Sequence, residues 1–391
     1  MTSYVKPLSE AFIKDRLLIA MQSDNYAGYD PFDGLNSKLF TTLKLDKVPF
    51  FRLVWLQLHK RLPINLRPLV DVPKERNPKG IALVILGLIE EYRHTKAPYY
   101  LTEAIQLGDW LLKKTSDKQQ WQHHCWGYNF PWQARAFYVP AGKPNIITTC
   151  YVARALFDLA DVSGDLRYQG AAIDAGRFIG SLFRQQNGRE YFVYIPGETT
   201  FIHNASLWGA AVASQAGAVS ADRELLDKAR RAVKQSAKEQ ATDGSWVYGE
   251  RTHHQFIDSF HTGYNLEAIW WYQQHTRERQ FDGMLRKGLA YYKAHFFLED
   301  GTPKYYNNAV YPVDMHCVAQ SVFTLMRVGG TEEDRQLVKK VLDWSIKHMF
   351  MLRKNTFRYQ KTSKTVNNVC YLRWTQAWMY YALSYQCNTM A

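Results

Sequence analysis

The chain has 391 residues, of which 46% are hydrophobic and 22% charged, so it can bury a large core and is not globally disordered. Lys and Arg outnumber Asp and Glu by 49 to 36. The formal net charge of +13 favours an anionic partner, such as nucleic acid, an anionic membrane or an acidic carbohydrate. Aromatic residues make up 15% of the chain, and their position along it becomes informative once the helices are assigned.

The N-terminal segment contains one amphipathic helix, predicted from Leu8 to Met21, and a turn-rich loop with the sequence NYAGYDPFDGLNS. The first residues show no basic stretch followed by an apolar block. Five cysteines occur without a Cys-x-x-Cys motif, so we expect a cytoplasmic protein without disulfides. No apolar run is long enough to predict a transmembrane helix.

From residue 46 onward, two series of helical segments alternate. The first series begins near Gly80, Thr149, Asn204, His261, His316 and Arg373, at intervals of 69, 55, 57, 55 and 57 residues. Members of the second series, such as YLTEAIQLGDWLLKK and ELLDKARRAVKQSAKE, follow the first five, and VPFFRLVWLQLHKRL precedes the first. Apolar residues at i, i+3, i+4 and i+7 with charges opposite are typical of helices that bury one face.

Six such pairs predict an all-α fold, an (α/α)6 toroid of six helical hairpins. One pair cannot bury its apolar face alone, so the six share a core. The lack of a polar capping pair favours a closed ring over an open α-solenoid. We expect the toroid to span residues 46–391 and a short N-terminal helical extension to span residues 1–45.

Long loops precede the inner, first-series helices, over residues 118–146, 186–203, 241–260, 298–315 and 351–372. With the first residue of the next helix they contain seven of the twelve histidines. Aromatic rings beside amides, histidines and arginines suit a sugar, which offers an apolar C–H face for stacking and hydroxyls for hydrogen bonds. Packing of the loops alone is the simpler explanation for any single ring. The candidate substrate-binding residues are Asn204, Arg251, Trp126, Trp132, Arg135, Trp246, Tyr248, Glu250, Tyr306, Tyr311, Asp314 and His316.

Asp258, His261 and Tyr264 are spaced i, i+3, i+6 at the start of an inner helix, so neighbours in this series can lie side by side. Inner-helix dipoles favour an anion there and keep a nearby histidine neutral. We expect His261 to be a base that removes the C5 proton of a uronate and Tyr264 to be the acid. Asn204 and Arg251 would neutralise the substrate carboxylate. His203 is a further catalytic candidate, although Asp258 also suits a helix N-cap and His261 a core position.

Hydrolysis of a glycosidic bond would instead need two carboxylates that flank it. Asp258 could pair with Glu250 or Asp314 for this purpose. Asp30 and Asp33 of the N-terminal loop are further candidates if the loop covers the mouth of the toroid, although turn formation explains them equally well. A non-catalytic toroid that binds glycans is a third possibility.

Two His–Cys doublets, His124–Cys125 and His316–Cys317, lack any standard zinc spacing, so we expect no metal and no other cofactor. Basic residues are scattered over outer helices such as KARRAVKQSAK, where a solvated face is the ordinary explanation. We therefore do not expect nucleic acid as a partner.

The segments NPKGIALVILGLIEEY, WGYNFPWQARAFYVPAGKPNIITT, FIHNASLWGAA, DGSWVYGE, IDSFHTGYNLEAI and YYNNAVYPVDMHCVAQS resemble a family of bacterial and archaeal proteins from polysaccharide-biosynthesis gene clusters. The resemblance covers most of the chain, including GYDPFDGLNS. It implies the toroid pattern of glucuronyl C5-epimerases and of lyases and hydrolases that act on uronates. Family members are sometimes labelled delta-aminolevulinic acid dehydratase, a βα-barrel enzyme that does not fit this helical repeat.

Matching motif positions imply functional roles for Trp126, Trp132, Gln133, Arg135, His203, Asn204, Trp246, Tyr248, Glu250, Asp258, His261, Tyr264, Tyr311, Asp314 and His316. The catalytic motif of the eukaryotic epimerase is not found in this sequence. Together these features predict an enzyme of surface-polysaccharide production that abstracts a C5 proton from a uronate glycan, giving epimerisation or β-elimination. Its expected partners are the glycan and other polysaccharide-assembly proteins.

Overall fold

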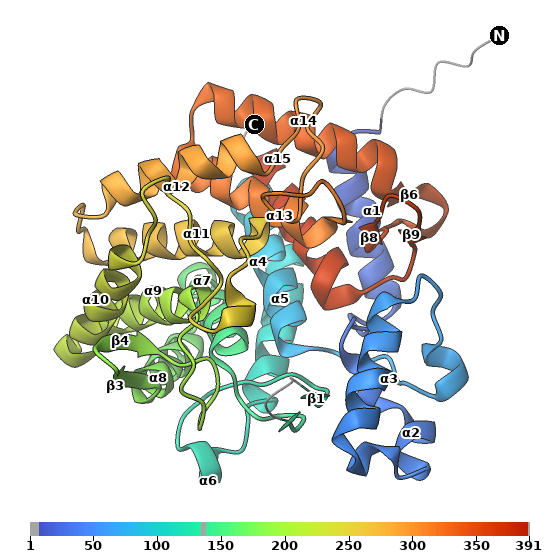
Figure 1. The fold of residues 1–391 in the computed structure, drawn as a ribbon, viewed down its shortest axis with the longest axis horizontal. Coiled ribbons are helices and arrows are strands. Elements are labelled where there is room, and N and C mark those ends of the chain that lie inside the picture. The colour runs from blue at the N-terminus through green and yellow to red at the C-terminus, as the bar shows by residue number, and fades with distance from the viewer. Residues whose placement is uncertain (1–7, 134–137, 390–391) are drawn as a thin grey trace.

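Six inner helices form a ring in the computed structural model, which describes residues 8–133 and 138–389. They begin one to three residues before the predicted starts, and each packs against the next in chain order. The last, α15, packs against the first, α4, so the ring is closed (Figure 1). These helices are α4 (Pro78–Thr95), α7 (Ile146–Ser163), α9 (His203–Ser220), α11 (Ser259–Thr276), α13 (Met315–Phe323) with the π-helical turn η5 (Thr324–Gly329), and the π-helical turn η7 (Leu372–Gln376) with α15 (Ala377–Thr389).

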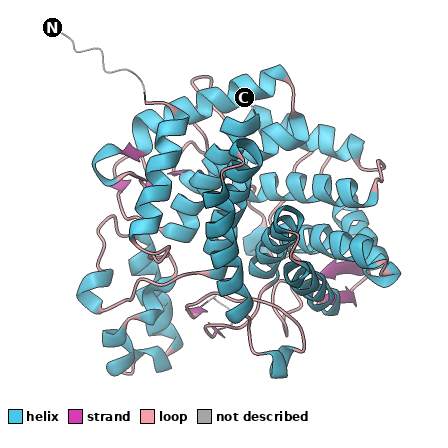
Figure 2. Ribbon diagram, turned by 180° about the vertical axis from the view of Figure 1, so that it is seen from behind, coloured by secondary structure: helices cyan, strands magenta, loops and turns pink. Residues whose placement is uncertain are grey.

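An outer ring of helices covers the inner one, which confirms the (α/α)6 toroid (Figure 2). The first five inner helices end at residues in the left-handed conformation, which close the last turn and let the chain reverse: Lys96, Gly164, Ala221, Arg277 and Gly330. The outer helices that follow are α5 (Pro98–Lys113), α8 (Leu166–Ser181), α10 (Arg223–Lys238), α12 (Asp282–His295) and α14 (Glu332–Met349). Within the described ranges, no helix combines the length and the apolar character needed to cross a membrane.

The sixth outer position differs from the prediction. Beside α15 lies α1 (Glu10–Ser23), which buries Ile13, Leu17 and Met21. The predicted occupant, α3 (Pro49–Arg61), instead packs against the short helices η1 (Asp33–Asn36) and η2 (Leu45–Lys47) and the strand β1 (Trp132–Gln133). Both helices are amphipathic, so the sequence pattern alone does not decide which of them completes the ring.

The remaining elements lie in the connections between helices. The short helices are α2 (Lys38–Thr42), η3 (Arg67–Val70), α6 (Lys118–Trp121), η4 (Thr252–His254) and η6 (Leu352–Lys354). Among the described residues, the antiparallel strands form four small sheets: β1 with β2 (Tyr138–Val139), β3 (Phe183–Gln186) with β4 (Arg189–Phe192), β6 (Phe350–Met351) with β7 (Thr356–Phe357), and β8 (Gln360–Lys361) between β5 (Val313–Asp314) and β9 (Val366–Asn367). Most of these strands lie within the long loops predicted before the inner helices.

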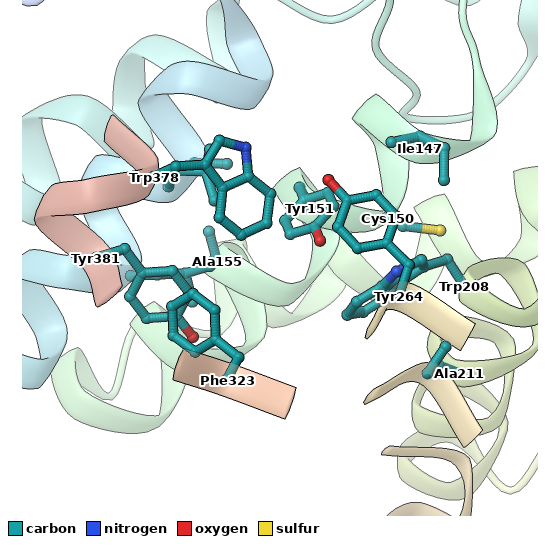
Figure 3. Close-up of a cluster of buried hydrophobic side chains, with 14 of the residues drawn as sticks. Ile147, Cys150, Tyr151, Ala155, Trp208, Ala211, Tyr264, Phe323, Trp378 and Tyr381 are labelled. Carbon is teal, nitrogen blue, oxygen red and sulfur yellow. The ribbon is translucent and has the colours of Figure 1, made fainter. Parts of the chain in front are cut away.

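Large aromatic side chains fill the centre of the ring (Figure 3). The aromatic ring centroid of Tyr151 lies 5.1 Å from that of Trp208 and 5.3 Å from that of Trp378. Tyr264 packs on the same cluster, 5.9 Å from Trp378. These rings come from four different inner helices, so the central channel is a packed core with the mouth above it.

Close packing between helix pairs can be tested at Gly176 of α8. A Cβ at Gly176 would lie 2.2 Å from Cβ of Ala216 in α9, so Gly176→Ala should lower the free energy of unfolding by about 1–3 kcal/mol. Gly170 in the same helix has open space around it, so Gly170→Ala should raise the free energy of unfolding by about 1 kcal/mol through helix propensity. Urea unfolding of both variants measures this, and equal effects would contradict the packing argument.

Candidate active site

A cavity of about 270 Å³ lies at the mouth of the toroid, where the inner helices begin. The second residue of each inner helix lines it, so all six helices contribute one side chain from the same position in the repeat. These residues are Lys79, Ile147, Asn204, Phe260, His316 and Arg373. Because the N–H groups of the first helical turns are oriented toward this end, the cavity favours a negatively charged group.

His261, which is partly exposed to the cavity, forms a pair with the buried carboxylate of Asp258. Asp258 is the N-cap of α11, and its Oδ1 accepts a 2.8 Å hydrogen bond from the backbone N–H of His261. Its Oδ2 lies 2.6 Å from Nδ1 of the same histidine. The carboxylate therefore orients the ring through Nδ1 and leaves Nε2 as the nitrogen that can accept a proton from a ligand. The expected capping role of Asp258 and its expected contact with His261 thus occur together.

Beside this pair, three polar side chains from different inner helices are linked by hydrogen bonds. Nζ of Lys79 donates a 3.1 Å hydrogen bond to the Tyr264 hydroxyl, and a 2.7 Å hydrogen bond joins that hydroxyl to Nε2 of His316. Burial raises the pKa of Tyr264 well above its ordinary value, so the hydroxyl keeps its proton. Burial, reinforced by Arg373, lowers the pKa of Lys79 well below its ordinary value. These three hydrogen-bonded side chains can therefore supply and relay a proton at one point of the cavity.

His316 has the most strongly enclosed imidazole in this group. Burial, with the positive charges of Lys79 and Arg373, lowers its pKa well below the ordinary value, so the ring is neutral. Its Nδ1 is buried and has no hydrogen-bond partner within the part of the chain that the structure describes. The ring stacks against Phe260 with centroids 4.8 Å apart. A neutral imidazole with an unused nitrogen is suited to bind or exchange a proton with a ligand.

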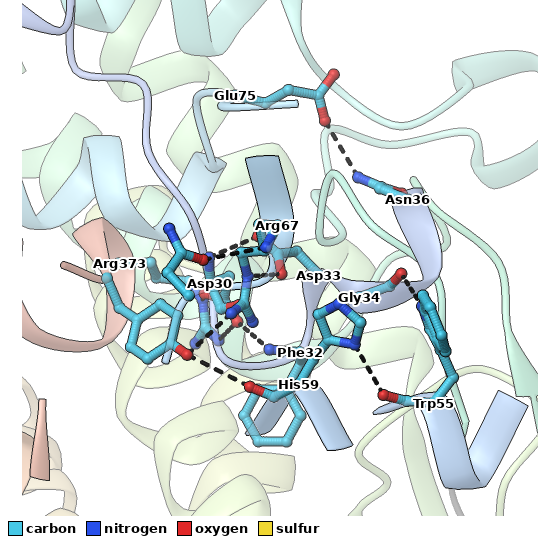
Figure 4. A network of polar contacts seen from close by, with 12 residues as sticks. Asp30, Phe32, Asp33, Gly34, Asn36, Trp55, His59, Arg67, Glu75 and Arg373 are labelled. Carbon is cyan, nitrogen blue, oxygen red and sulfur yellow. Dashed lines mark hydrogen bonds and ion pairs between the residues drawn. The ribbon is translucent and has the colours of Figure 1, made fainter. Parts of the chain in front are cut away.

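The N-terminal loop holds Arg373 in place (Figure 4). Asp30 accepts two hydrogen bonds from the guanidinium of Arg373, at 2.6 and 2.8 Å. Arg67 in turn donates to the backbone oxygen of Asp30 at 2.6 Å and to Asp33 at 2.5 Å. Asp30 and Asp33 are therefore paired with buried arginines and do not line the cavity.

Aromatic side chains form most of the cavity wall. They come from the N-terminal loop, from the long loops and from the inner helices: Phe32, Tyr128, Phe130, Trp132, Tyr194, Tyr248, Phe260, Tyr264, Tyr305 and Trp374. Such a wall can stack on the apolar face of a sugar ring, while Asn204 offers an Oδ1 that is buried without a protein partner among the described residues. Of the aromatic residues predicted to bind substrate, Trp132 and Tyr248 line the cavity.

No carboxylate lines the cavity within the described residues. Asp258 faces His261, and Asp314 accepts hydrogen bonds from Trp374 Nε1 at 3.1 Å and Gln360 Nε2 at 3.1 Å. In the same part of the chain, no group of three or more His, Cys, Asp or Glu side chains is placed to hold a metal ion. The geometry favours histidine and tyrosine chemistry over a pair of catalytic carboxylates.

Several predicted site residues have structural positions instead. The indoles of Trp126 and Trp246 are buried and donate to the carbonyl oxygens of Leu111 and Ser236, which lie in the last turns of α5 and α10. Each thereby adds a second donor to a helix-end carbonyl that also accepts from the backbone N–H of the capping residue, Lys114 or Glu239. The sequence pattern of aromatics before inner helices does not separate these anchors from rings that line the mouth.

His203 and Glu250 also belong to the scaffold. His203 is buried between α9 and α10, with Nδ1 3.2 Å from Ser236 Oγ, and burial lowers its pKa to about 4. Glu250 accepts from the backbone N–H of Phe201 at 2.8 Å and pairs with Arg189 at 2.9 Å. Neither residue reaches the cavity, so the geometry does not support a catalytic or substrate-binding role for them.

Three further predicted binding residues, Arg251, Tyr306 and Tyr311, do not line the cavity either. Tyr311 is 41% exposed, and Tyr306 packs against Tyr305, with ring centroids 4.7 Å apart. Arg251 precedes η4 in the loop that leads to α11. Arg135 lies outside the described residues.

Lys79 and Arg373, the two cations closest to the histidines, are absent from the predicted set. Lys79 is in NPKG at the start of the first inner segment, and Arg373 begins the last. Aligning the first turns of the six repeats would have placed both beside Asn204 and His316. Lys60, which comes from α3, gives no such signal, because α3 does not belong to the ring.

The sequence matches no protein-family model and no curated protein. The structure is similar to cellobiose 2-epimerase from Bacillus thermoamylovorans B4167, with 12% identity, a TM-score of 0.63, and coverage of 82% of this chain and 90% of that chain. It is also similar to an unsaturated glucuronyl hydrolase specific for heparin (12% identity, TM-score 0.64, 97% and 95% covered) and to D-mannose isomerase (11% identity, TM-score 0.63, 100% of both chains covered). At such identities the similarity establishes the fold, the (α/α)6 toroid.

The buried carboxyl of Asp314 predicts a pH-dependent stability. Burial raises its pKa from 3.8 to about 7, so the folded protein keeps a proton that the unfolded chain releases. The stabilisation is therefore present below about pH 4 and is lost as pH rises toward 7. We expect the stability of the wild type relative to Asp314→Asn to fall by up to about 4 kcal/mol over that range. Urea unfolding of both proteins between about pH 4 and pH 8 measures it, and a constant difference would contradict the assignment.

Proposed function

We propose that the protein is a carbohydrate-acting enzyme that removes a proton from the carbon next to the carboxyl group of a uronate within an oligo- or polysaccharide. The observation that carries this proposal is the Asp258–His261 pair on the wall of a cavity that no described carboxylate lines. The product is the C5 epimer or, if the bond to the 4-linked sugar breaks, an unsaturated uronate.

His261 acts as the base in this scheme. Asp258 orients the ring and stabilises the imidazolium that forms when Nε2 accepts the C5 proton. The electron pair left at C5 is delocalised into the substrate carboxylate. Groups that stabilise negative charge are needed where that charge develops. Arg373 and the inner-helix N-termini line this position with positive charge, and Lys79, whose pKa burial lowers, lines it as a hydrogen-bond donor.

Tyr264 is placed to return a proton. It lines the cavity, it keeps its proton because burial raises its pKa, and Lys79 and His316 are hydrogen-bonded to its hydroxyl. Delivery of that proton to the opposite face of C5 completes an epimerisation, and delivery to the 4-oxygen completes a β-elimination. In the epimerisation the bond from C4 to its oxygen stays intact, whereas in the β-elimination it breaks as the C4–C5 double bond forms.

The similar structures support the broader part of the proposal, because they are named as epimerases, an isomerase and hydrolases of sugars. A non-catalytic glycan-binding toroid is the second candidate, favoured by the aromatic wall. A glycoside hydrolase is less well supported, since none of Asp258, Glu250 and Asp314 lines the cavity. The role in surface-polysaccharide production, the assembly partners and the cytoplasmic location stay predictions from the sequence.

Hydrogen exchange at carbon tests the proposed reaction. Incubation with glucuronate-containing glycans in D2O should place deuterium at C5, which nuclear magnetic resonance detects. His261→Gln and Asp258→Asn should each slow the exchange by about 10²–10⁴-fold, because one removes the base and the other removes its orienting carboxylate. The melting temperature of both variants shows whether the fold is retained.

His253→Gln is the matched control, since His253 is an exposed histidine in the same loop and does not line the cavity. It should exchange at the wild-type rate. Deuterium at C2 of a neutral sugar would contradict the uronate assignment, and new reducing ends without exchange would favour hydrolysis. Glycan binding without any turnover would favour the non-catalytic toroid.

A further inference from the structure

Helix α3 has several large apolar residues on the face that the fold leaves open. It buries Leu56 and His59, whereas Phe50 is 67% exposed and Val54 is 50% exposed. Phe50, Val54 and Leu58 follow one another at intervals of four residues, which places them along one side of the helix. A surface helix of a globular protein normally has the opposite arrangement, with apolar residues inside.

Neighbouring segments extend this exposed apolar character. Leu39 of α2 is 46% exposed and Leu43, which caps this helix, is 58% exposed. Ile64 and Leu69 after α3 are 67% and 80% exposed. Helix α2 contacts η2 and η3, and α3 contacts η2, so these segments form one body beside the ring. In both views α2 and α3 project at the edge of the molecule (Figures 1 and 2). Exposed apolar residues at this density mark a contact surface.

The same body is strongly basic. Residues 38–71 contain seven Lys or Arg residues and two acidic residues, Asp46 and Asp71, which pair with Lys47 at 3.3 Å and Lys38 at 3.1 Å. The side chains of Lys38 and Lys47 are 70% and 75% exposed, and Arg61 is exposed at the end of the apolar row of α3. A second copy of the chain docked symmetrically on this face would bring these cations against one another, which opposes self-association.

We propose that the α2–α3–η3 body docks the protein on the surface of an anionic lipid bilayer. Phe50, Val54 and the neighbouring leucines would enter the boundary between headgroups and acyl chains. Lys38, Lys47 and Arg61 would contact the anionic headgroups. Apolar burial and attraction to negative lipids are the two contributions that hold an interfacial helix at a membrane.

Docking in this way has a geometric consequence for the mouth of the toroid. Lys60 of α3 lines the cavity, and its Nζ lies 4.8 Å from the ring centroid of Phe32, which lines it too. Helix α3 also packs against β1, which contains the cavity residue Trp132. The cavity would therefore open next to the headgroup layer. The membrane proposal does not depend on the reaction proposed above.

Co-sedimentation with vesicles tests the proposal. The full chain should sediment with vesicles that contain phosphatidylglycerol and phosphatidylcholine, much less with phosphatidylcholine alone, and less as salt is raised. The double variants Phe50→Ser with Val54→Ser, and Lys47→Glu with Arg61→Glu, should each weaken binding at least about tenfold. These side chains are exposed, so the melting temperature should stay at the wild-type value.

Matched controls lie on other outer helices. Leu166→Ser removes a leucine that is 71% exposed on α8, and Lys234→Glu with Lys238→Glu reverses two exposed charges on α10. Both should bind vesicles as the wild type does. Equal loss in the controls, equal binding to neutral vesicles, or no vesicle binding would overturn the proposal. Self-association that Phe50→Ser with Val54→Ser abolishes, without vesicle binding, would replace it with an interface between copies.

Discussion

The ring closes where α15 packs against α4, and the arrangement of the mouth depends on that contact. Gly87 of α4 leaves no room for a side chain there, because a Cβ would lie 2.6 Å from the ring of Tyr380. With the first and last inner helices in contact, all six helix N-termini meet around one point. Side chains separated by up to about three hundred residues, such as Lys79 and Arg373, then line one cavity.

Convergence of helix N-termini also shapes the chemistry of the cavity. Each first turn presents N–H groups, so the site is electropositive before any cation is counted. Buried Arg373 adds to this field, although Asp30 from the N-terminal loop balances its charge, and the field lowers the pKa of Lys79. The imidazole of His316 stays neutral in this environment. His261, the proposed base, lies on the wall of the same cavity, where groups that attract an anion suit proton abstraction next to a carboxylate.

Local sequence patterns predicted the parts of this structure that depend on local contacts. The repeat interval located the inner helices, and the i, i+3 spacing correctly placed Asp258 beside His261, because both follow from helix geometry. The link from Tyr264 to Lys79 joins residues 185 positions apart, so only the closed ring brings them together. The same reason explains why His203 and Trp246, which resemble site residues in sequence, turn toward the outer helices. The sequence pattern placed α3, where the structure has α1, at the sixth outer position, because either amphipathic helix fits there.

The central claim is that the first turns of the six inner helices assemble one uronate site around His261. A crystal structure of the His261→Gln variant with a bound glucuronate oligosaccharide tests it most directly. The account predicts a uronate ring in the cavity, with its carboxylate beside Lys79 and C5 within about 4 Å of the residue-261 side chain. An oligosaccharide bound elsewhere on the toroid, or with its carboxylate turned away from Lys79 and Arg373, would contradict it.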